Sequence, residues 1–401
     1  MAWVSIGKFA LFFIGTGFLI WRYFIAAIDS SQTYLKAPHY TTRAVLLSLA
    51  VFSLSLIWTT GDTEDSLGSI GKYGKLLTIL LIPLMLKTRQ EVVYAIVAFI
   101  AAQLFLVGSS WLLFFGVHLP YATSSMATSQ FAVFSTYLDQ GVISATVAAM
   151  CWHLRKLAPG RFGKPVFIGI SLLCMLNVLF VLIGRSGHVV LIVLLSMAAM
   201  WELPKKYRWS ILVLPIIFLA LAITTSSKVR ERTTQMASEI KAFSVGEGNN
   251  IKSGTSSGVR LQFWRRSVQS IAESPILGSG VGSWSNEYDR IEKKHNPSGA
   301  KVNKRGNPHQ EYLLWGVQLG AVGMLLFAGL LVAIFKDTAK GDVASQRAAL
   351  SVLAALVVSC LFNSSIYDAL IGDFFCVSLG LTLALVASSI KPLPDSTSRT
   401  A

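Results

Sequence analysis

Long apolar runs recur along almost the whole chain, and they constrain its fold more than any other feature. Examples are FALFFIGTGFLI, LLTILLIPLML and VFIGISLLCMLNVLFVLI. A helix needs roughly 20 mostly apolar residues to cross a bilayer, where backbone polar groups must be bonded internally. Only 14% of the residues are charged, against roughly a quarter in a typical soluble domain. The sequence therefore predicts an all-α polytopic membrane protein.

The apolar runs predict eleven spanning helices, and a short hairpin hidden in the first 30 residues would make twelve. The eleven segments are 8–27, 42–59, 71–87, 92–116, 135–154, 166–183, 187–201, 209–225, 310–335, 347–363 and 370–389. Nothing at the N-terminus resembles a cleavable signal, because further spans follow at once. We expect spanning helices in 1–225 and 309–389, a polar loop region in 226–308, and a disordered cytoplasmic tail in 390–401.

The loop region itself shows helical periodicity in two places. Residues 228–243 read as an amphipathic helix, and 258–274 return to helical spacing after the Gly/Ser/Asn-rich stretch 244–257. The segment PILGSGVGSW then predicts a break, and we expect a basic loop over 290–305. The glycines of 278–283 predict a tight turn where backbone approaches backbone or a phosphate.

Short basic loops set the expected orientation. The loops 151–165, 202–208 and 336–347 each carry several Lys or Arg residues, so we place them in the cytoplasm. The loops 59–66 and 117–134 are acidic or uncharged and alternate with them. This parity places the C-terminus inside and predicts a multi-pass membrane protein.

The loop region 226–308 lies outside by this parity, although it holds fourteen Lys or Arg and seven Asp or Glu. Long loops escape the positive-inside rule, so the topology stands. The excess of positive charge predicts anionic partners on the outer face. We expect phosphate-bearing lipids or lipid-linked substrates rather than nucleic acid.

The stretch NPHQEYL, at the start of the span 310–335, places polar residues at the mouth of an apolar segment. Asn307 fits a helix N-cap and Pro308 the first helical position, which would put His309 in the first turn. The positive end of a helix disfavours imidazolium, so this placement predicts a neutral His309 that can accept a proton. The alternative is an interfacial histidine that hydrogen-bonds a loop carbonyl.

Arginines on the same expected face supply the second part of a site. Arg185 lies in the tight hairpin VLIGRSGHVV, where charge is costly and usually functional, unless it snorkels to lipid phosphates. Arg260, Arg265 and Arg266 alternate with Phe263 and Trp264 on a predicted helix. Arginine binds phosphate oxygens in pairs and stays charged. One base beside several arginines predicts transfer from a diphosphate-activated donor.

The pattern SGVRLQFWRRSVQSIAESPILGSGVGSW, then a basic loop, then NPHQEYLLWGVQLGAVGMLLF, resembles the O-antigen ligase family of Wzy-C-type membrane proteins. An arginine precedes an aromatic-rich helix, a P-I-L-G-x-G turn follows, and a histidine opens a helix containing G-x-x-G. The resemblance is strongest over 258–324 and extends to Arg185. The usual HN-x-(Y/F)-L is PHQEYL here, with Gln310 after His309.

The resemblance implies a fold of the GT-C class with about twelve helices in the bacterial inner membrane. It also implies transfer of O-antigen polysaccharide from undecaprenyl diphosphate to lipid A–core at the periplasmic face, with neither ATP nor a metal. His309 would deprotonate the acceptor hydroxyl, and Arg185 and Arg260 would hold the diphosphate, with Arg265 as a further candidate. Candidates for acceptor or phosphate contacts are Arg266, Gln310 and Tyr312.

Two other functions remain open: an O-antigen polymerase or protein O-oligosaccharyltransferase of similar fold, and a transporter or flippase of polyprenyl-linked glycans. A transporter should place charges near the bilayer midplane, whereas these cluster at one face.

Metal and dinucleotide sites have weaker support. We expect Asp62 and Glu64 to lie in a solvated loop, no acidic pair near His309, and His188 to be structural. The glycines of 278–283 follow no strand, as a dinucleotide site would require. The four cysteines lack metal-ligand spacing and fit small buried apolar positions.

Overall fold

The computed structural model describes residues 35, 38–122, 129–208, 256–295 and 306–389, together with the single positions 17 and 234. Within these residues the chain is helical and contains no strand. The helices are α2 (His39–Leu54), η1 (Ser55–Ile57), α3 (Thr63–Tyr73), η2 (Gly74–Leu76), α4 (Leu77–Met85), α5 (Arg89–Phe114), α7 (Tyr137–Leu154), α8 (Gly163–Leu176), η3 (Asn177–Val181), α9 (Arg185–Glu202), η4 (Lys205–Tyr207), α12 (Ser256–Glu273), α13 (Trp284–His295), α14 (Glu311–Thr338), α15 (Val343–Ser359) and α16 (Ala369–Ser389). The predicted fold class, an all-α polytopic membrane protein, is confirmed.

Seven of the described helical segments are long and apolar enough to cross a membrane. They are His39–Ile57, Thr63–Met85, Arg89–Phe114, Gly163–Val181, Arg185–Glu202, Glu311–Thr338 and Ala369–Ser389. Two further predicted spans form the helices α7 and α15, of which α15 is short and α7 is buried along most of its length. The predicted spans 8–27 and 209–225 and the predicted helix 228–243 lie outside the described residues.

Two boundaries differ from the predictions by more than four residues. The span predicted from residue 71 begins at Thr63, so Glu64 and Asp65 lie in the first turn of α3, where acidic side chains complement the helix dipole. The basic loop predicted over 290–305 begins as helix α13, which reaches His295. The buried residues Trp284, Tyr288 and Ile291 of α13 have helical spacing, a signal that the prediction of a basic loop overlooked because the segment is otherwise polar and charged.

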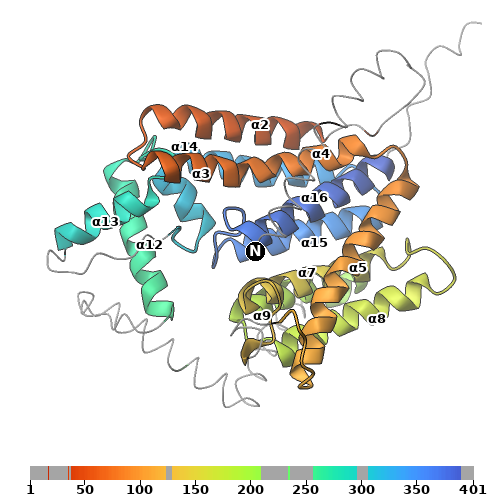
Figure 1. The fold of residues 1–401 in the computed structure, drawn as a ribbon. Coiled ribbons are helices and arrows are strands. Elements are labelled where there is room, and N and C mark those ends of the chain that lie inside the picture. Colours follow the sequence, from red (N-terminus) through yellow and green to blue (C-terminus); the bar gives the residue numbers. More distant parts are fainter. Residues whose placement is uncertain are drawn as a thin grey trace, which may run out of the picture.

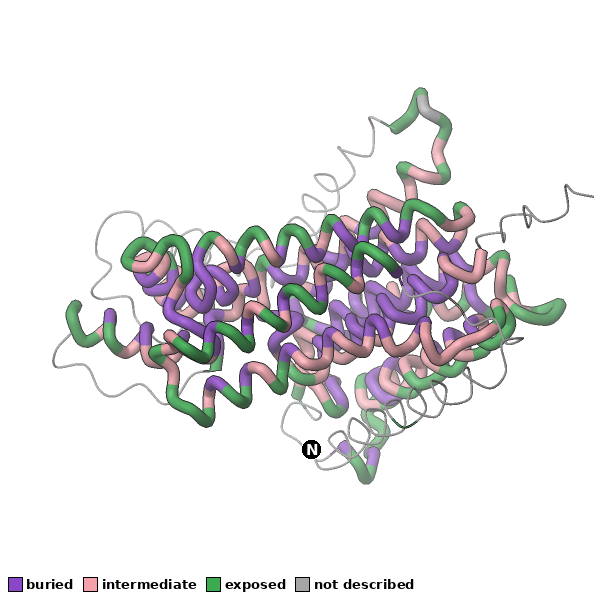
Figure 2. The backbone as a smooth tube through the Cα atoms, turned by 90° about the horizontal axis from the view of Figure 1, so that it is seen from above, coloured by how far each residue is buried: buried purple, intermediate pink, exposed green. Residues whose placement is uncertain are grey.

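The helices on the two sides of the molecule pack against a central pair. In Figure 1, α2, α3 and α4 run along one side, α15 and α16 lie centrally, and α7, α8 and α9 lie on the other side. Helices α12 and α13 stand together at one end, which we call the α12 end. Buried positions run through the centre of the assembly, and exposed positions line the outward faces of helices such as α2 (Figure 2). A lipid-facing outer surface explains exposed apolar side chains such as Leu46 and Leu47.

An aromatic cluster joins α2, α3 and α14. The Phe52 and Tyr73 rings stack with centroids 4.1 Å apart, and the Trp315 ring meets Phe52 edge-on at 4.7 Å. All three side chains are fully buried. Such ring pairs add about 0.5–1.5 kcal/mol each beyond the area they bury. They anchor the first half of α14, which begins two residues after His309.

Helix α14 is broken at Gly320, and the glycine-rich turn fills the break. Gly320 has φ 60° inside the helix, so the amides of Ala321 and Val322 lose their partners four residues back. They donate instead to the carbonyls of Pro275 (2.8 Å) and Ile276 (3.2 Å). The carbonyls of Val317 and Gln318 accept from the amides of Ser279 (2.9 Å) and Gly280 (2.8 Å). All four groups are therefore satisfied, as burial requires.

This exchange confirms the tight turn predicted for 278–283. Gly278, Gly280 and Gly282 all have positive φ. The backbone of the turn lies against the α2–α3 connection, where Thr60 N donates to Ser279 O (2.9 Å) and Thr59 Oγ1 to Val281 O (2.6 Å). The turn thus ties α12 and α13 to α2, α3 and α14.

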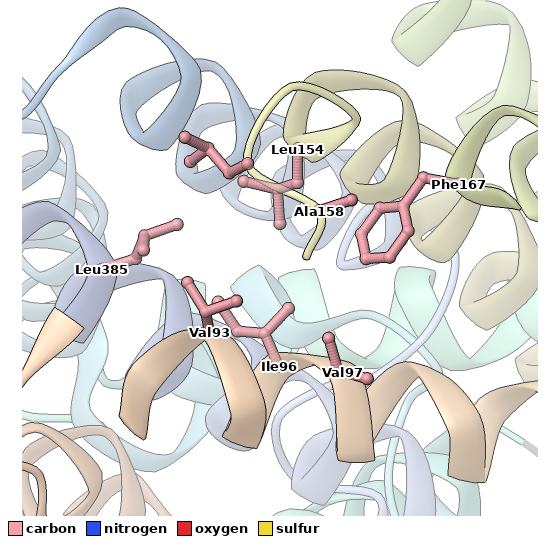
Figure 3. A pocket seen from close by; sticks show the side chains of 8 residues that line it. Val93, Ile96, Val97, Leu154, Ala158, Phe167 and Leu385 are labelled. Carbon is pink, nitrogen blue, oxygen red and sulfur yellow. The ribbon is translucent and has the colours of Figure 1, made fainter. Parts of the chain in front are cut away.

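The loops expected in the cytoplasm meet at the end opposite α12. Arg155, before α8, and Arg347, on α15, both pair with Glu202 at the end of α9, at 3.0 Å and 3.5 Å. Arg89, at the start of α5, pairs with Asp342 at 2.7 Å. An apolar pocket lies near this end between α5, α8 and α16; its side chains include Val93, Ile96, Phe167 and Leu385 (Figure 3). Only apolar side chains line it, so it offers no group for acid–base or nucleophilic chemistry. All four cysteines are buried, as predicted.

Candidate active site

His309 lies in the segment that leads into α14, outside the helix. The side-chain oxygen of Asn307 accepts a hydrogen bond from the His309 amide at 2.8 Å, and His309 has φ 53° in the left-handed region. The helix begins at Glu311, with Gln310 as its N-cap: Gln310 Oε1 accepts from the Leu313 amide at 3.2 Å.

The predicted N-cap and first turn were therefore wrong. The Asn307 side chain bonds the amide of His309, two residues on, instead of capping the helix. Pro308 precedes His309, whose φ angle is positive. A non-glycine residue with positive φ is uncommon and concentrates at functional sites. The backbone strain at His309 agrees with a functional position and directs its side chain independently of the helix.

Helix α12 holds the 307–309 segment through its aromatic side chains. Trp264 Nε1 donates to the Pro308 carbonyl at 3.1 Å. The Phe263 ring lies roughly parallel to the His309 ring, with centroids 6.2 Å apart. Phe263 is buried against Trp284 and Tyr288 of α13. The predicted helix 258–274 is confirmed, and its aromatic residues support the histidine.

Arg260 lies one turn before Trp264 on α12, and it faces charges from three other parts of the chain. Burial lowers the pKa of Arg260; the phenol of Tyr137 and the carboxyls of Asp368 and Asp139 oppose that shift, and Arg185 adds to it. Arg185 and Arg260 are therefore close enough for their charges to interact, although they stand 75 positions apart in the sequence. Two arginines that repel each other form a ready site for an anion.

Arg185 is positioned by a close helix crossing. It is the first residue of α9, and the next turn contains Gly187, which lies against Gly141 of α7: a Cβ on Gly187 would meet the Gly141 Cα at 2.8 Å. Small residues allow such close approach of helix backbones. The crossing brings the start of α9 beside the start of α7, where Tyr137 and Asp139 lie. His188 bonds the Gly184 carbonyl at 2.8 Å within the same turn, in agreement with a structural role.

The loop between α15 and α16 completes the cluster with residues that the sequence did not indicate. Asn363 Oδ1 lies 3.4 Å from His309 Nδ1, and Asn363 Nδ2 donates to Asp139 Oδ1 at 3.3 Å. Asp368 Oδ1 accepts from Asn307 Nδ2 at 2.8 Å. Burial raises the pKa of the Asp368 carboxyl, and the charges of His309, Lys75 and Lys72 act against that shift.

The expectation of no acidic pair near His309 was wrong. Asp139 and Asp368 both lie in the cluster and interact electrostatically with each other and with Arg260. They come from α7 and from the end of the α15–α16 loop, 229 positions apart, and only the packing joins them. The polar stretch NSSIYD between two apolar runs could have indicated a functional loop here, but the predicted span 347–363 included Asn363.

Glu311, the first residue of α14, anchors the α15–α16 loop through hydrogen bonds. One of its carboxylate oxygens accepts from the amides of Ile366 (2.9 Å) and Tyr367 (3.2 Å), and the other accepts from Trp315 Nε1 (2.9 Å). The Glu311 amide donates to the Cys360 carbonyl at 3.1 Å. Glu311 is fully buried, and this set of donors compensates for its lost hydration. The residue two after His309 therefore fixes the loop that carries Asn363 and Asp368.

The remaining predicted site residues have other contacts. Arg266 is buried and its Nε pairs with Glu292 of α13 at 2.7 Å, which accounts for its burial. Tyr312 donates to the Val357 carbonyl at 3.2 Å, and Gln310 caps α14. Arg265 is exposed on α12. A role in substrate contact stays a prediction for these four residues.

A cavity opens within the cluster between α7, α9, α12 and the α15–α16 loop. Its lining includes Asp139, Ser186, Arg260 and Asn363, together with apolar side chains such as Val142 and Ile371. Charged and apolar side chains therefore line the same small cavity. Asp62 and Glu64 lie elsewhere: Asp62 bonds Asn286 of α13 at 3.2 Å. Among the described residues, no group of three or more His, Cys, Asp or Glu side chains is arranged to hold a metal ion.

The fold and this site define a multi-pass helical membrane protein with a histidine, two arginines and two carboxyls clustered at one end. Residues 170–328 match the Wzy_C family, described as O-antigen ligase. The matched segment, less than half of the chain, contains Arg185, Arg260 and His309, and it confirms the resemblance to an O-antigen ligase-like family. No curated protein matches the chain.

Proposed function

We propose that this protein is an O-antigen ligase, which transfers polysaccharide from undecaprenyl diphosphate to a sugar hydroxyl of lipid A–core. The family match supports a membrane glycosyltransferase-like enzyme acting on lipid-linked glycans. The observation that carries the proposal is the convergence of Arg185, Arg260 and His309 from α9, α12 and the segment before α14. A donor with a diphosphate leaving group needs these residue types together.

The chemistry is a single displacement. His309 takes the proton of the acceptor hydroxyl as its oxygen attacks the anomeric carbon of the donor sugar. The bond between that carbon and the diphosphate oxygen breaks, and the diphosphate keeps the electron pair. Arg185 and Arg260 stabilise the negative charge that grows on the leaving group.

We further propose a GT-C-type enzyme that works without a metal ion. Its support is that the two arginines supply the positive charge which a divalent cation would otherwise bring to the diphosphate. Asp139 and Asp368 fit this arrangement without a cation, since each faces an arginine or a histidine.

The active site is proposed to face the periplasm from the inner membrane. Its support is the separation of the two ends: the basic loops at Arg155 and Arg347 meet at the end opposite α12. Basic loops of this length favour the cytoplasm, so the α12 end would lie outside, where polysaccharide on its lipid carrier would meet lipid A–core and membrane lipids.

In vitro transfer tests the proposal. Purified protein in detergent or nanodiscs, supplied with a polysaccharide on a polyprenyl-diphosphate carrier and lipid A–core, should yield the joined product. A gene deletion then separates ligase from polymerase. Loss of a ligase leaves full-length polysaccharide on the carrier, whereas accumulation of single repeats would favour the polymerase and overturn the proposal.

A further inference from the structure

Asn363 lies between His309 and Asp139 and contacts both through its side-chain amide. Its oxygen is 3.4 Å from His309 Nδ1, and its nitrogen is 3.3 Å from Asp139 Oδ1. The three residues belong to the segment before α14, the α15–α16 loop and the first turn of α7. Nothing in the proposed displacement yet uses Asn363 or Asp139.

We propose that Asn363 and Asp139 are positioning residues that fix the tautomer of His309, so that Nε2 is the nitrogen that receives the acceptor proton. The inference rests on the proposed role of His309 as base. It deepens that role because it assigns the proton transfer to one ring nitrogen and names the residues that enforce the choice.

Asp139, Asn363 and His309 form a hydrogen-bond relay. The donors and acceptors on these three side chains determine its direction. An ionised carboxylate can only accept, so Asp139 requires the NH₂ group of Asn363 to face it. The Asn363 oxygen then faces His309 and can only accept, which requires a proton on Nδ1. A neutral imidazole carries one proton, so its lone pair lies on Nε2. Asp139 therefore sets the orientation of the amide, and the amide sets the tautomer.

Both positioning residues are held by their own surroundings. Asp139 lies in the first turn of α7, where its amide donates to Oγ1 of the N-cap Thr136 at 3.2 Å. Burial raises the pKa of the Asp139 carboxyl to about 6, and the hydrogen bond with Thr136 and the charge of Arg260 oppose that shift. The carboxyl is therefore ionised at neutral pH. The Asn363 loop is fixed by the Glu311 carboxylate and by Lys75, whose ammonium donates to the Asp368 carbonyl at 2.6 Å. This support provides the preorganised geometry that a general base needs.

Other charges around His309 bear on its titration and stay the same in every variant of the test. They are Asp368 before α16, Arg260 on α12, Arg185 on α9, and Lys72 and Lys75 on α3 and η2. A change in the pH profile after substitution at 139 or 363 therefore arises from these two side chains.

The test compares three variants of the full-length protein in the transfer assay across pH. Asn363→Ala removes the acceptor for Nδ1–H, and Asp139→Asn removes the group that orients the amide. Each should lower turnover by at least about tenfold, a part of the 100- to 10,000-fold typical of a general base, with little change in the donor KM. The double variant Asp139→Asn/Asn363→Asp exchanges the two side chains and keeps the net charge.

The exchange variant separates positioning from packing. Its new carboxylate at position 363 would accept directly from His309 Nδ1–H and would be oriented by the new amide at position 139. Turnover should recover toward the wild-type value at high pH, and the acid limb should move up by about one pH unit or more, because a carboxylate now adjoins the imidazole. If the side chain at position 363 only packed the loop without contacting His309 Nδ1, the acid limb would not move. Asn286→Ala is the matched control, since Asn286, on α13, bonds Thr60 O and Asp62 away from the cluster.

Two results would overturn the relay. The first is a wild-type turnover and pH profile in Asn363→Ala. The second is an exchange variant that has the melting temperature of the wild type but is no more active than Asn363→Ala and shows no shift of the acid limb. His309→Ala, assayed in parallel, keeps this inference separate from the proposed function. If His309→Ala retains turnover, the base assignment itself is wrong. If only His309→Ala loses turnover, the base stands and the relay is refuted.

Discussion

Gly278 and Gly320 contact each other through their backbones where the glycine-rich turn enters the break in α14. Their φ angles are 62° and 60°, and a Cβ on Gly278 would lie 2.6 Å from the Gly320 nitrogen. The contact places α12, with Arg260, against the helix that follows His309. It is the joint through which the two parts of the site keep their relative positions.

Substitution at this joint should destabilise the protein. Gly320, with φ 60° and ψ −145°, has a backbone conformation that is essentially confined to glycine, so alanine there costs about 1–3 kcal/mol. A Cβ at either position would also displace the facing backbone. We expect Gly278→Ala and Gly320→Ala to lower the melting temperature in detergent and to reduce transfer. Gly329→Ala, in the same helix but with nothing within 4 Å of a Cβ, should be neutral or stabilising. Equal melting temperatures for Gly320→Ala and Gly329→Ala would show that the joint carries no strain.

His309 and the arginines should fail in different ways. His309→Ala should lose about 100- to 10,000-fold in turnover while donor binding survives. Arg185→Ala and Arg260→Ala should lower turnover and weaken donor affinity, because the leaving group gains charge during the reaction. Arg260→Lys should recover only part, since lysine lacks the paired geometry. Turnover and donor binding of the four variants decide this. Loss of donor binding in His309→Ala alone would make the histidine a diphosphate ligand.

Glu311 should be needed for loop geometry rather than for the reaction itself. In Glu311→Gln, one carboxylate oxygen becomes an NH₂ group, so at least one of the three N–H donors it serves is left without an acceptor. A buried unsatisfied donor costs about 1–3 kcal/mol. The melting temperature should fall, and transfer should fall with it as Asn363 and Asp368 shift. Glu64→Gln, exposed in the first turn of α3, is the control and should have little effect. Matching behaviour of the two variants would contradict this role.

Asp368 should make stability depend on pH. Burial raises the pKa of its carboxyl in the folded protein, above the unfolded value of about 3.9. Its contribution to stability is therefore fully present below that value and is lost as pH rises through the folded pKa. Asp368→Asn keeps an acceptor for Asn307 but removes the titration. The melting temperature of the variant, relative to wild type, should rise from pH 4 to pH 8, while turnover falls because the His309 cation loses its neighbour. A pH-independent difference would refute the shift.

Transfer should survive removal of divalent cations. Purified protein in excess EDTA should retain its turnover, because Arg185 and Arg260 supply the charge at the diphosphate. If EDTA abolishes transfer and added Mg²⁺ or Mn²⁺ restores it, the arginines do not suffice. Asp139→Asn and Asp62→Asn, assayed with a titrated cation, would then locate the metal by a changed cation requirement.

The sequence alone determined the class of the protein, because the relevant signals are local. The length of the apolar runs predicts membrane spans, and the spacing of the glycines predicts a tight turn. The short motifs around Arg260 and His309 indicate the family. Each depends on neighbours within one or two helical turns. Helix α12, the turn at Gly278–Gly282 and the burial of the cysteines were predictable for this reason.

Only the tertiary structure decided the composition of the site. Asp139, Asn363 and Asp368 are ordinary polar residues near helix ends until the α7–α9 crossing at Gly141 and Gly187 and the anchoring of the last loop by Glu311 bring them to His309. The conformation of His309 was likewise set by distant contacts: Trp264 holds Pro308, and Asn307 binds Asp368. Local pattern favoured a helix start at that point. Packing between segments far apart in the chain outweighed it, because the hydrogen bonds formed there satisfy buried groups that a longer helix would leave without partners.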